Sequence, residues 1–175
     1  MLTDLDEIGR RSKDNAGVNL RFRRFLKAHH QPDGPFRILA ERVQHEMDCT
    51  QCANCCRQFI VGVTRQEIEV MAAYVETPVE EFIDQYTEQD PDDSRERVLL
   101  NRDEGCAFLD GNLCMVYDAR PKPCREFPHL ALKHNSLGAR MATVFKRAPL
   151  CPIIYNSIER YKQLVGYQDT ENERH

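Results

Sequence analysis

The sequence predicts an α+β fold: a small helical domain with a short β-hairpin or sheet, and irregular cysteine-bearing loops around a metal centre. Two observations lead to this prediction. Apolar residues at helical spacing alternate along the chain with short β-rich runs. Eight cysteines occur among 175 residues, and none of them precedes position 49. With 41% apolar and 30% charged residues, the composition is typical of a globular chain that buries a hydrophobic core.

Residues 1–35 predict an N-terminal helical arm in which apolar residues recur at helical spacing and arginines occupy the other faces. Such a basic amphipathic helix either binds a partner or packs its phenylalanines on the core, and we favour packing as the commoner case. A break rich in proline and glycine at 31–35 ends the arm. We therefore predict a cysteine-cluster metal-binding domain over 36–167 and a frayed tail over 168–175.

The helical pattern resumes over 36–47, and a β-rich run follows at 59–63. Thr64 and Glu67 have the spacing of a capping box, which predicts a helix to about Tyr74. A similar start signal, with proline at the first helical position, predicts a second helix from Thr77–Pro78 to about Tyr86. The acidic stretch from Glu76 to Glu104 is interpreted as a solvated loop rather than a binding surface for a cationic substrate.

The second half of the chain predicts four further elements. Val98–Leu100 predicts a strand, and an Asp-Gly pair at 110–111 predicts a tight hairpin turn. Arg140–Phe145 predicts a last strand, and Pro152–Val165 predicts a C-terminal helix with its apolar residues on one side.

Composition excludes several classes of function. The net charge of −4 argues against general nucleic-acid binding, and no apolar run approaches the roughly 20 residues of a membrane span. The charged N-terminus lacks the apolar region of a secretory signal, so we expect a cytoplasmic protein. In a reducing compartment clustered cysteines bind metal or perform redox chemistry more often than they form disulfides. Phosphate loops, dinucleotide fingerprints and catalytic triads are not recognisable, so catalytic residues are unknown.

The strongest chemical signal is the group formed by Cys49, Cys52, Cys55 and Cys56. Three cysteines in series at this spacing, with a fourth from a distant segment, commonly hold a four-iron cluster. A structural zinc site usually shows two separated pairs instead. The spacing therefore favours an iron–sulfur cluster, of 4Fe-4S type, over zinc. The alternative is that the cysteines are unrelated buried thiols.

Cys55 and Cys56 are adjacent, so their Cα atoms lie only about 3.8 Å apart. In an extended chain their side chains diverge, and a disulfide between them would be strained. We therefore expect one of the two to complete the first group and the other to face a second site or the core. Eight cysteines suit two four-ligand centres, or one cluster plus several packed or redox-active thiols.

The second group is Cys106, Cys114 and Cys124. A hairpin at the Asp-Gly turn would bring Cys106 and Cys114 near each other. Arg120 and Arg125 favour the thiolate of Cys124 and offer donors to sulfur or to a bound cofactor. The alternative is that both arginines are structural and bind carboxylates or backbone carbonyls.

Cys151 precedes the C-terminal helix, where amide donors would stabilise its thiolate. We expect Cys49, Cys52 and Cys55 to form one centre that Cys106, Cys114, Cys124 or Cys151 completes. Three histidines near cysteines are interpreted as surface or supporting residues: His45, His129 and His134. All eight cysteines are candidate metal ligands: Cys49, Cys52, Cys55, Cys56, Cys106, Cys114, Cys124 and Cys151.

These motifs, in this order, resemble the CxxCxxCC cysteine-cluster family, a zinc- or iron-chelating domain also called YkgJ-like. The resemblance covers roughly residues 45–155 and rests on the following pairs and motifs: Cys49 to Cys56, Thr64 with Glu67, Cys106 with Phe108 and Leu109, Cys114 with Val116 and Tyr117, Arg120-Pro121, Cys124-Arg125 and Phe127-Pro128. The family is spread through bacteria. It often has glycine where this chain has Asn54, and asparagine also tolerates left-handed backbone geometry.

The resemblance extends to the cysteine-rich domain of flagellin lysine N-methylases, in which an iron–sulfur cluster is implied; those enzymes are much longer than this chain. The leading hypothesis is a metal-binding protein that uses an iron–sulfur cluster or zinc in electron transfer or redox sensing. One alternative is a cluster-dependent enzyme that resembles a protein methyltransferase. Another is a structural zinc module that recruits a protein partner. Neither nucleic acid nor a membrane span is expected.

Overall fold

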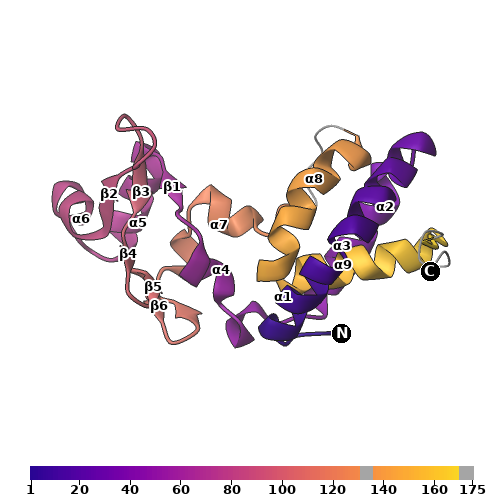
Figure 1. The fold of residues 1–175 in the computed structure, drawn as a ribbon. Helices are drawn as coiled ribbons and strands as arrows, with labels where there is room; N and C mark the ends of the chain where they lie inside the picture. The colour runs from indigo at the N-terminus through magenta and orange to yellow at the C-terminus, as the bar shows by residue number, and fades with distance from the viewer. Residues whose placement is uncertain (131–135, 170–175) are drawn as a thin grey trace. The chain divides into compact units, whose positions relative to one another are not determined.

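The computed structural model describes residues 1–130 and 136–169, and it confirms the α+β prediction, with helices and small antiparallel sheets (Figure 1). The chain divides into two compact units. Unit 1 comprises residues 1–48 and 128–175, and unit 2 comprises residues 49–127. The domain boundaries expected at 35 and 167 stay a prediction, and most of the expected tail lies outside the described residues.

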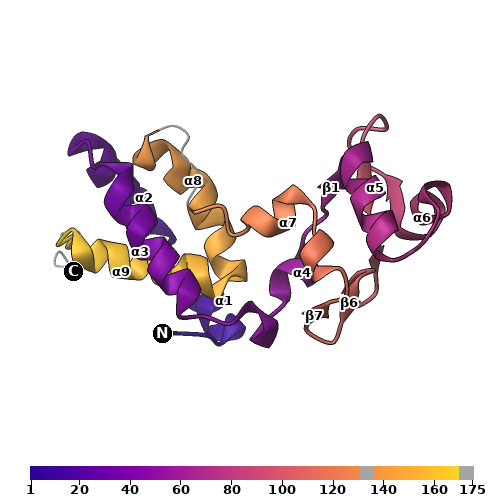
Figure 2. The ribbon, with the colours of Figure 1, turned by 180° about the vertical axis from the view of Figure 1, so that it is seen from behind.

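Unit 1 is built from helices with these bounds: α1 Leu5–Asp14, α2 Ala16–Ala28, α3 Asp33–His45, α8 Leu137–Arg147 and α9 Pro152–Leu164. Helix α3 packs against α9, and α2 packs against α8 (Figures 1 and 2). The ring of Phe36 meets Tyr161 edge-on, with 5.2 Å between centroids. Phe22 is fully buried, which confirms that the N-terminal segment packs its phenylalanine on a core.

The strand predicted over Arg140–Phe145 is wrong, because this segment is part of helix α8. Its β-branched and aromatic residues favour a strand locally, but Leu137, Met141 and Val144 recur at helical spacing and are buried. Tertiary packing of that apolar face decides the conformation. The guanidinium of Arg140 pairs with Asp33 and donates to the Leu130 carbonyl at 2.6 Å, which fastens α8 to the neighbouring segments.

Unit 2 contains a three-stranded antiparallel sheet in the order β1-β3-β2 and two short two-stranded ribbons. Its strands have these bounds: β1 Gly62–Val63, β2 Thr87–Gln89, β3 Arg97–Leu99, β4 Asn101–Arg102, β5 Gly105–Cys106, β6 Leu109–Asp110 and β7 Leu113–Cys114. Its α-helices are α4 Asn54–Gln58, α5 Arg65–Tyr74, α6 Val79–Tyr86 and α7 Lys122–Glu126. The predicted helices after Thr64 and Pro78 and the strand near Val98 are confirmed.

The core of unit 2 lies between α5, α6 and the strands. Phe82 from α6 stacks on Phe108 with 5.7 Å between ring centroids, and Tyr86 stacks on the same ring at 4.8 Å. Cys106 and Cys114 are half-buried and pack against the edge of this core. Their sulfurs are therefore partly removed from water by an apolar cluster.

The hairpin near the Asp-Gly pair exists, and its turn lies one residue later than the predicted Asp110-Gly111 turn. Leu109 pairs with Cys114 and Asp110 pairs with Leu113, so the two turn residues are Gly111 and Asn112. Gly111 has φ of +57°, the left-handed geometry that glycine tolerates. Cys106 belongs to a separate ribbon, where it pairs with Asn101. The two cysteines are consequently not partners across this turn.

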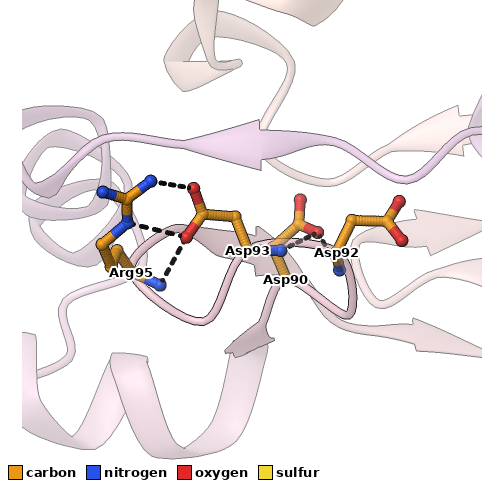
Figure 3. A network of polar contacts seen from close by, with 4 residues as sticks. All are labelled: Asp90, Asp92, Asp93 and Arg95. Atoms are coloured by element: carbon orange, nitrogen blue, oxygen red, sulfur yellow. Dashed lines mark hydrogen bonds and ion pairs between the residues drawn. The ribbon is translucent and has the colours of Figure 1, made fainter.

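The acidic stretch forms, in part, the connection between β2 and β3 (Figure 3). The side chain of Asp90 accepts hydrogen bonds from the backbone amides of Asp92, at 2.7 Å, and Asp93, at 3.3 Å. Asp93 pairs with Arg95 at 2.7 Å. These exposed contacts are local, so the loop neutralises part of its own charge, as expected for a solvated turn.

The predicted capping box is present and has an additional partner. Oε2 of Glu67 accepts from the Thr64 amide at 2.9 Å, while Thr64 Oγ1 accepts from the Glu67 amide at 3.3 Å. Oε1 of Glu67 also accepts from the Lys122 amide at 2.7 Å, at the start of α7. Burial raises the pKa of Glu67, but the hydrogen bonds from Thr64 and Lys122 outweigh it, so the pKa is lowered overall. One carboxylate therefore joins the starts of α5 and α7.

Replacing Glu67 with glutamine should loosen one of the two helix starts, because the side-chain amide keeps one oxygen acceptor and turns its N–H donors toward the other backbone N–H. We expect a loss of about 1 kcal/mol, the scale of a helix cap. Faster amide hydrogen exchange over residues 64–74 or over residues 122–126 would measure it. The control is Glu69→Gln in the same helix, whose carboxylate contacts exposed Arg65 at 3.2 Å. Equal exchange in both variants would contradict the prediction.

Candidate metal centre

The first cysteine segment folds as a tight turn followed by the short helix α4. The carbonyl of Cys49 accepts hydrogen bonds from the amides of Cys52, at 3.1 Å, and Ala53, at 3.0 Å. Ala53 has φ of +48° and is buried, and Asn54 is the first helical residue. The left-handed position expected at Asn54 is therefore one residue earlier. A residue with a β-carbon is strained there, at a cost of about 1–2 kcal/mol.

Cys55 and Cys56 do not diverge, because α4 places them on successive helical positions. Their Sγ atoms lie 3.9 Å apart, within range of an S–H···S hydrogen bond and far beyond the roughly 2.05 Å of a disulfide. The hydrogen bond from Cys55 is the main cause that lowers the pKa of Cys56 to about 7. Burial opposes this shift, and the charges of Arg57 and Arg120 support it.

Four thiols from four segments form one group: Cys56 on α4, Cys106 on β5, Cys114 on β7 and Cys124 on α7. Burial is the main cause that raises the pKa of Cys124 to about 12, and the negative charges of the other three add to it. Burial likewise raises the pKa of Cys106 and of Cys114, with further contributions from neighbouring thiolates. Each of the four therefore interacts electrostatically with each of the others. We call this set the four-thiol group.

The approach of β5 to α4 requires glycine at position 105. Gly105 has φ of +123°, and a β-carbon there would lie 2.7 Å from the carbonyl oxygen of Cys56 and 2.9 Å from Cα of Arg57. Both contacts are shorter than real β-carbons tolerate. Because Cys106 follows directly, this contact sets the separation between two members of the four-thiol group.

Arg57 fastens the first cysteine segment to the hairpin that carries Cys114. Its guanidinium donates to the Cys52 carbonyl at 2.9 Å, to the Gly111 carbonyl at 2.6 Å and to Oδ1 of Asn112 at 2.7 Å. A planar guanidinium has enough fixed donors to make all three bonds together. Arg57 therefore positions both segments and adds positive charge next to Cys56.

Arg120 and Arg125 contact backbone carbonyls. Arg120 donates through Nε to the Tyr117 carbonyl at 2.7 Å, and its guanidinium lies 3.4 Å from the centroid of the Tyr117 ring. Arg125 donates to the Arg120 carbonyl. These bonds match the structural alternative for both arginines. The charge of Arg120 also lowers the pKa of Cys56, Cys114 and Cys124, so it favours thiolates. A role for either arginine in holding a cofactor stays a prediction.

The remaining sequence candidates come from other segments of the chain. Cys49 is exposed and Cys52 is partly exposed, both in the turn before α4. Cys151 is buried in unit 1 directly before α9, as the predicted helix start required. His45 ends α3 in unit 1, His129 has φ of +62° in the same unit, and His134 lies outside the described residues.

Within the described ranges, no three His, Cys, Asp or Glu side chains are arranged to hold a metal ion as they stand. The four-thiol group nevertheless fits zinc or iron in the chemistry of its donors, because both metals bind thiolate sulfur. Its members already interact through their charges. The fold has already brought the four segments near one another. Metal binding would therefore have to move only their side chains closer.

A family model covers residues 48–152 of the chain, and its description reads "Putative zinc- or iron-chelating domain". The match spans all four segments of the four-thiol group. The chain belongs to the CxxCxxCC family. The resemblance inferred from the sequence is thus confirmed, and with it the link to zinc or iron chelation. No solved structure matches this CxxCxxCC chain. Among the described residues, no helix has the length and apolar character needed to cross a membrane.

Sequence reasoning missed three residues that shape the site: Ala53, Arg57 and Gly105. Local signals existed, because Arg57 follows Cys56 and Gly105 precedes Cys106 in the chain. The importance of Arg57 and Gly105 depends on contacts between segments about 50 residues apart, which the sequence does not specify. Only the folded chain identifies their partners.

Gly105→Ala should push β5 away from α4 and weaken metal binding, because its β-carbon has no room. The strained φ adds a cost of about 1–3 kcal/mol. The matched control is Gly62→Ala, where a β-carbon would meet nothing within 4 Å. Thermal unfolding and metal content of both purified variants would measure the difference. If Gly105→Ala retained wild-type values in both, the contact would not be limiting.

Proposed function

We propose that this protein binds one zinc or iron ion through Cys56, Cys106, Cys114 and Cys124, and that the ion holds unit 2 together. The observation that carries this proposal is the mutual electrostatic interaction of these four thiols. Four thiolates without a carboxylate among them are the donor set of a tetrahedral site for zinc or iron. The family's description supports the same two metals.

The grouping supports a single ion more than the 4Fe-4S cluster that the spacing favours. A four-iron cluster of the usual kind takes three cysteines in series and one remote cysteine. In this chain Cys56, which directly follows the series Cys49, Cys52 and Cys55, interacts with three remote cysteines. That arrangement is closer to four separate ligands converging on one ion.

A metal in the four-thiol group would link segments that are otherwise weakly supported. The strands of unit 2 have two or three residues each, and α4 and α7 have five. Such short elements bury little apolar surface on their own. A metal that bridges α4, β5, β7 and α7 would add its binding free energy to the folding of this unit.

The basic residues around the group support thiolate ligands. Arg57 and Arg120 are the two arginines whose charges lower the pKa of Cys56. Four thiolates around a divalent ion leave two net negative charges, and nearby cations offset part of that charge. In the metal-bound site Arg57 and Arg120 would offset negative charge and bind backbone carbonyls, without contacting the metal themselves.

Serine variants of single cysteines, purified without oxygen, should identify the ligands. We expect bound metal to fall strongly for Cys56→Ser, Cys106→Ser, Cys114→Ser and Cys124→Ser, because each removes one of four thiolates. Cys151→Ser in unit 1 reports whether the buried thiol before α9 belongs to the ligand set as well. Elemental analysis and a sulfide assay provide the measurement.

Two results would contradict the assignment. If Cys49→Ser and Cys52→Ser lost the metal while Cys114→Ser retained it, the ligand set would be the one inferred from spacing. If sulfide accompanied iron in equal amounts, with the absorption of a cluster, an iron–sulfur centre would replace the single ion. Stoichiometric zinc without sulfide would support the proposal.

Metal binding should release protons, and the apparent affinity should rise with pH. At neutral pH Cys106, Cys114 and Cys124 are protonated, since the pKa of each is raised, whereas Cys56 with a pKa of about 7 is half ionised. Binding through all four should release about 3.5 protons, one from each protonated thiol and half of one from Cys56. Calorimetry in buffers of different ionisation enthalpy measures this number. Release of about one proton would contradict a four-thiolate site.

A further inference from the structure

The segment after α9 folds onto helix α2 within unit 1. We call residues 166–169 the C-terminal strap, and the side chains of Arg21, Phe22 and Phe25 the α2 face. We propose that the α2 face recognises an extended segment of a protein partner, which carries an aromatic residue and, two residues later, a carboxylate. The strap occupies this face in the structure and competes with the partner. This inference is independent of the metal site in unit 2.

A glycine turn at the end of α9 sets the direction of the strap. Gly166 has φ of +63°, the left-handed geometry that glycine tolerates. Its amide donates to the Gln163 carbonyl at 3.1 Å, and the Tyr167 amide donates to the Lys162 carbonyl at 2.9 Å. These two bonds are the Schellman pattern that ends a helix. The chain therefore leaves the axis of α9 at Gly166, and Tyr167 contacts α2.

Two side chains of the strap contact the α2 face. The Tyr167 ring centroid lies 4.8 Å from that of Phe22 and 5.2 Å from that of Phe25. The Asp169 carboxylate accepts from Nε of Arg21 at 2.7 Å and from a terminal nitrogen of the same guanidinium at 2.5 Å. Aromatic pairs and bidentate arginine–carboxylate pairs both depend on geometry. The strap thus shows what the face selects: a ring and a carboxylate at a spacing of two residues.

The charge of α2 favours an acidic partner segment. The helix contains no carboxylate and has four cations: Arg21, Arg23, Arg24 and Lys27. The strap brings one carboxylate to this helix, that of Asp169. A partner segment with further acidic residues would gain more attraction from the same cations than the strap does. Such a segment can therefore displace a competitor that belongs to the chain itself.

The α2 face does not depend on the strap alone for its position. Phe22 is fully buried, and its ring centroid also lies 6.3 Å from that of Tyr161 in α9. Helix α2 packs along α8, where Arg23 donates to the Gly138 carbonyl at 2.7 Å. Side chains that are already held in place lose little freedom on binding, which favours affinity. Release of the strap would therefore leave a preformed site.

The test uses the full chain with both contact side chains of the strap changed, as Tyr167→Ala with Asp169→Asn. The probe is a fluorescently labelled peptide with the sequence of residues 164–170, and fluorescence anisotropy measures its binding. A tethered segment competes at an effective concentration of about 1 mM, so a peptide with a Kd of about 0.1 mM should bind the double variant about tenfold more tightly than wild type. Circular dichroism establishes that each variant is folded.

Further variants make the result specific. Arg21→Gln, added to the double variant, should weaken peptide binding strongly, because the carboxylate loses its bidentate partner. Arg24→Gln is the matched control, since Arg24 is exposed on the same helix outside the α2 face, and it should weaken binding less. Asp169→Asn alone keeps the aromatic contacts of the strap and should give an intermediate gain. A peptide with alanine in place of its tyrosine should bind more weakly to every variant.

Several outcomes would overturn the inference. Equal binding to wild type and to the double variant, or binding to neither, would show that the α2 face is not a recognition surface. Equal binding of the peptides with and without tyrosine would show that the face does not select the ring. A wild-type dimer that the double variant loses in sedimentation would make the strap of a second copy the occupant, which overturns the assignment to a separate partner.

Discussion

The site depends on one steric constraint: the backbone of β5 presses against the backbone of α4 at Gly105. A β-carbon there would overlap the carbonyl oxygen of Cys56, at 2.7 Å, so only glycine allows the approach. Cys106 follows directly, and its thiol is thereby brought to Cys56. Arg57, on the same turn of α4, then binds the Gly111 carbonyl and brings in the hairpin with Cys114. Cys124 is the remaining member, and Glu67 holds the start of its helix through the Lys122 amide.

Gathering four thiols in a half-buried place has an electrostatic consequence. Burial raises the pKa of Cys124 to about 12, and the negative charges of the other three members contribute to that rise. Among the four members, Cys56, which accepts the hydrogen bond of Cys55, has its pKa lowered to about 7. The metal-free group is therefore mostly protonated at neutral pH. A metal ion would offset the repulsion between the thiolates, because its positive charge lets all four be ionised together.

The two units use different means of stabilisation. Unit 1 buries whole helical faces, with aromatic contacts such as Phe36 against Tyr161 at 5.2 Å. Unit 2 has a smaller core around Phe82 and Phe108, and its strands are very short. Hydrogen bonds of side chains such as Glu67 and Arg57 hold segments of unit 2 together. This difference explains why a metal centre would matter more to unit 2 than to unit 1.

The sequence alone determined the features that depend on local chemistry. Two helices were identified by the Thr64–Glu67 capping box and the helix start near Pro78, and the family was identified by the CxxCxxCC spacing. Each of these features needs only residues close together in the chain. The tertiary structure decided the rest. It made a helix of Arg140–Phe145 because an apolar face had to be buried, and it moved the left-handed residue to Ala53. It also brought Cys56 to Cys106, Cys114 and Cys124. That grouping depends on the close backbone contact at Gly105, between segments about 50 residues apart, which spacing along the chain cannot reveal.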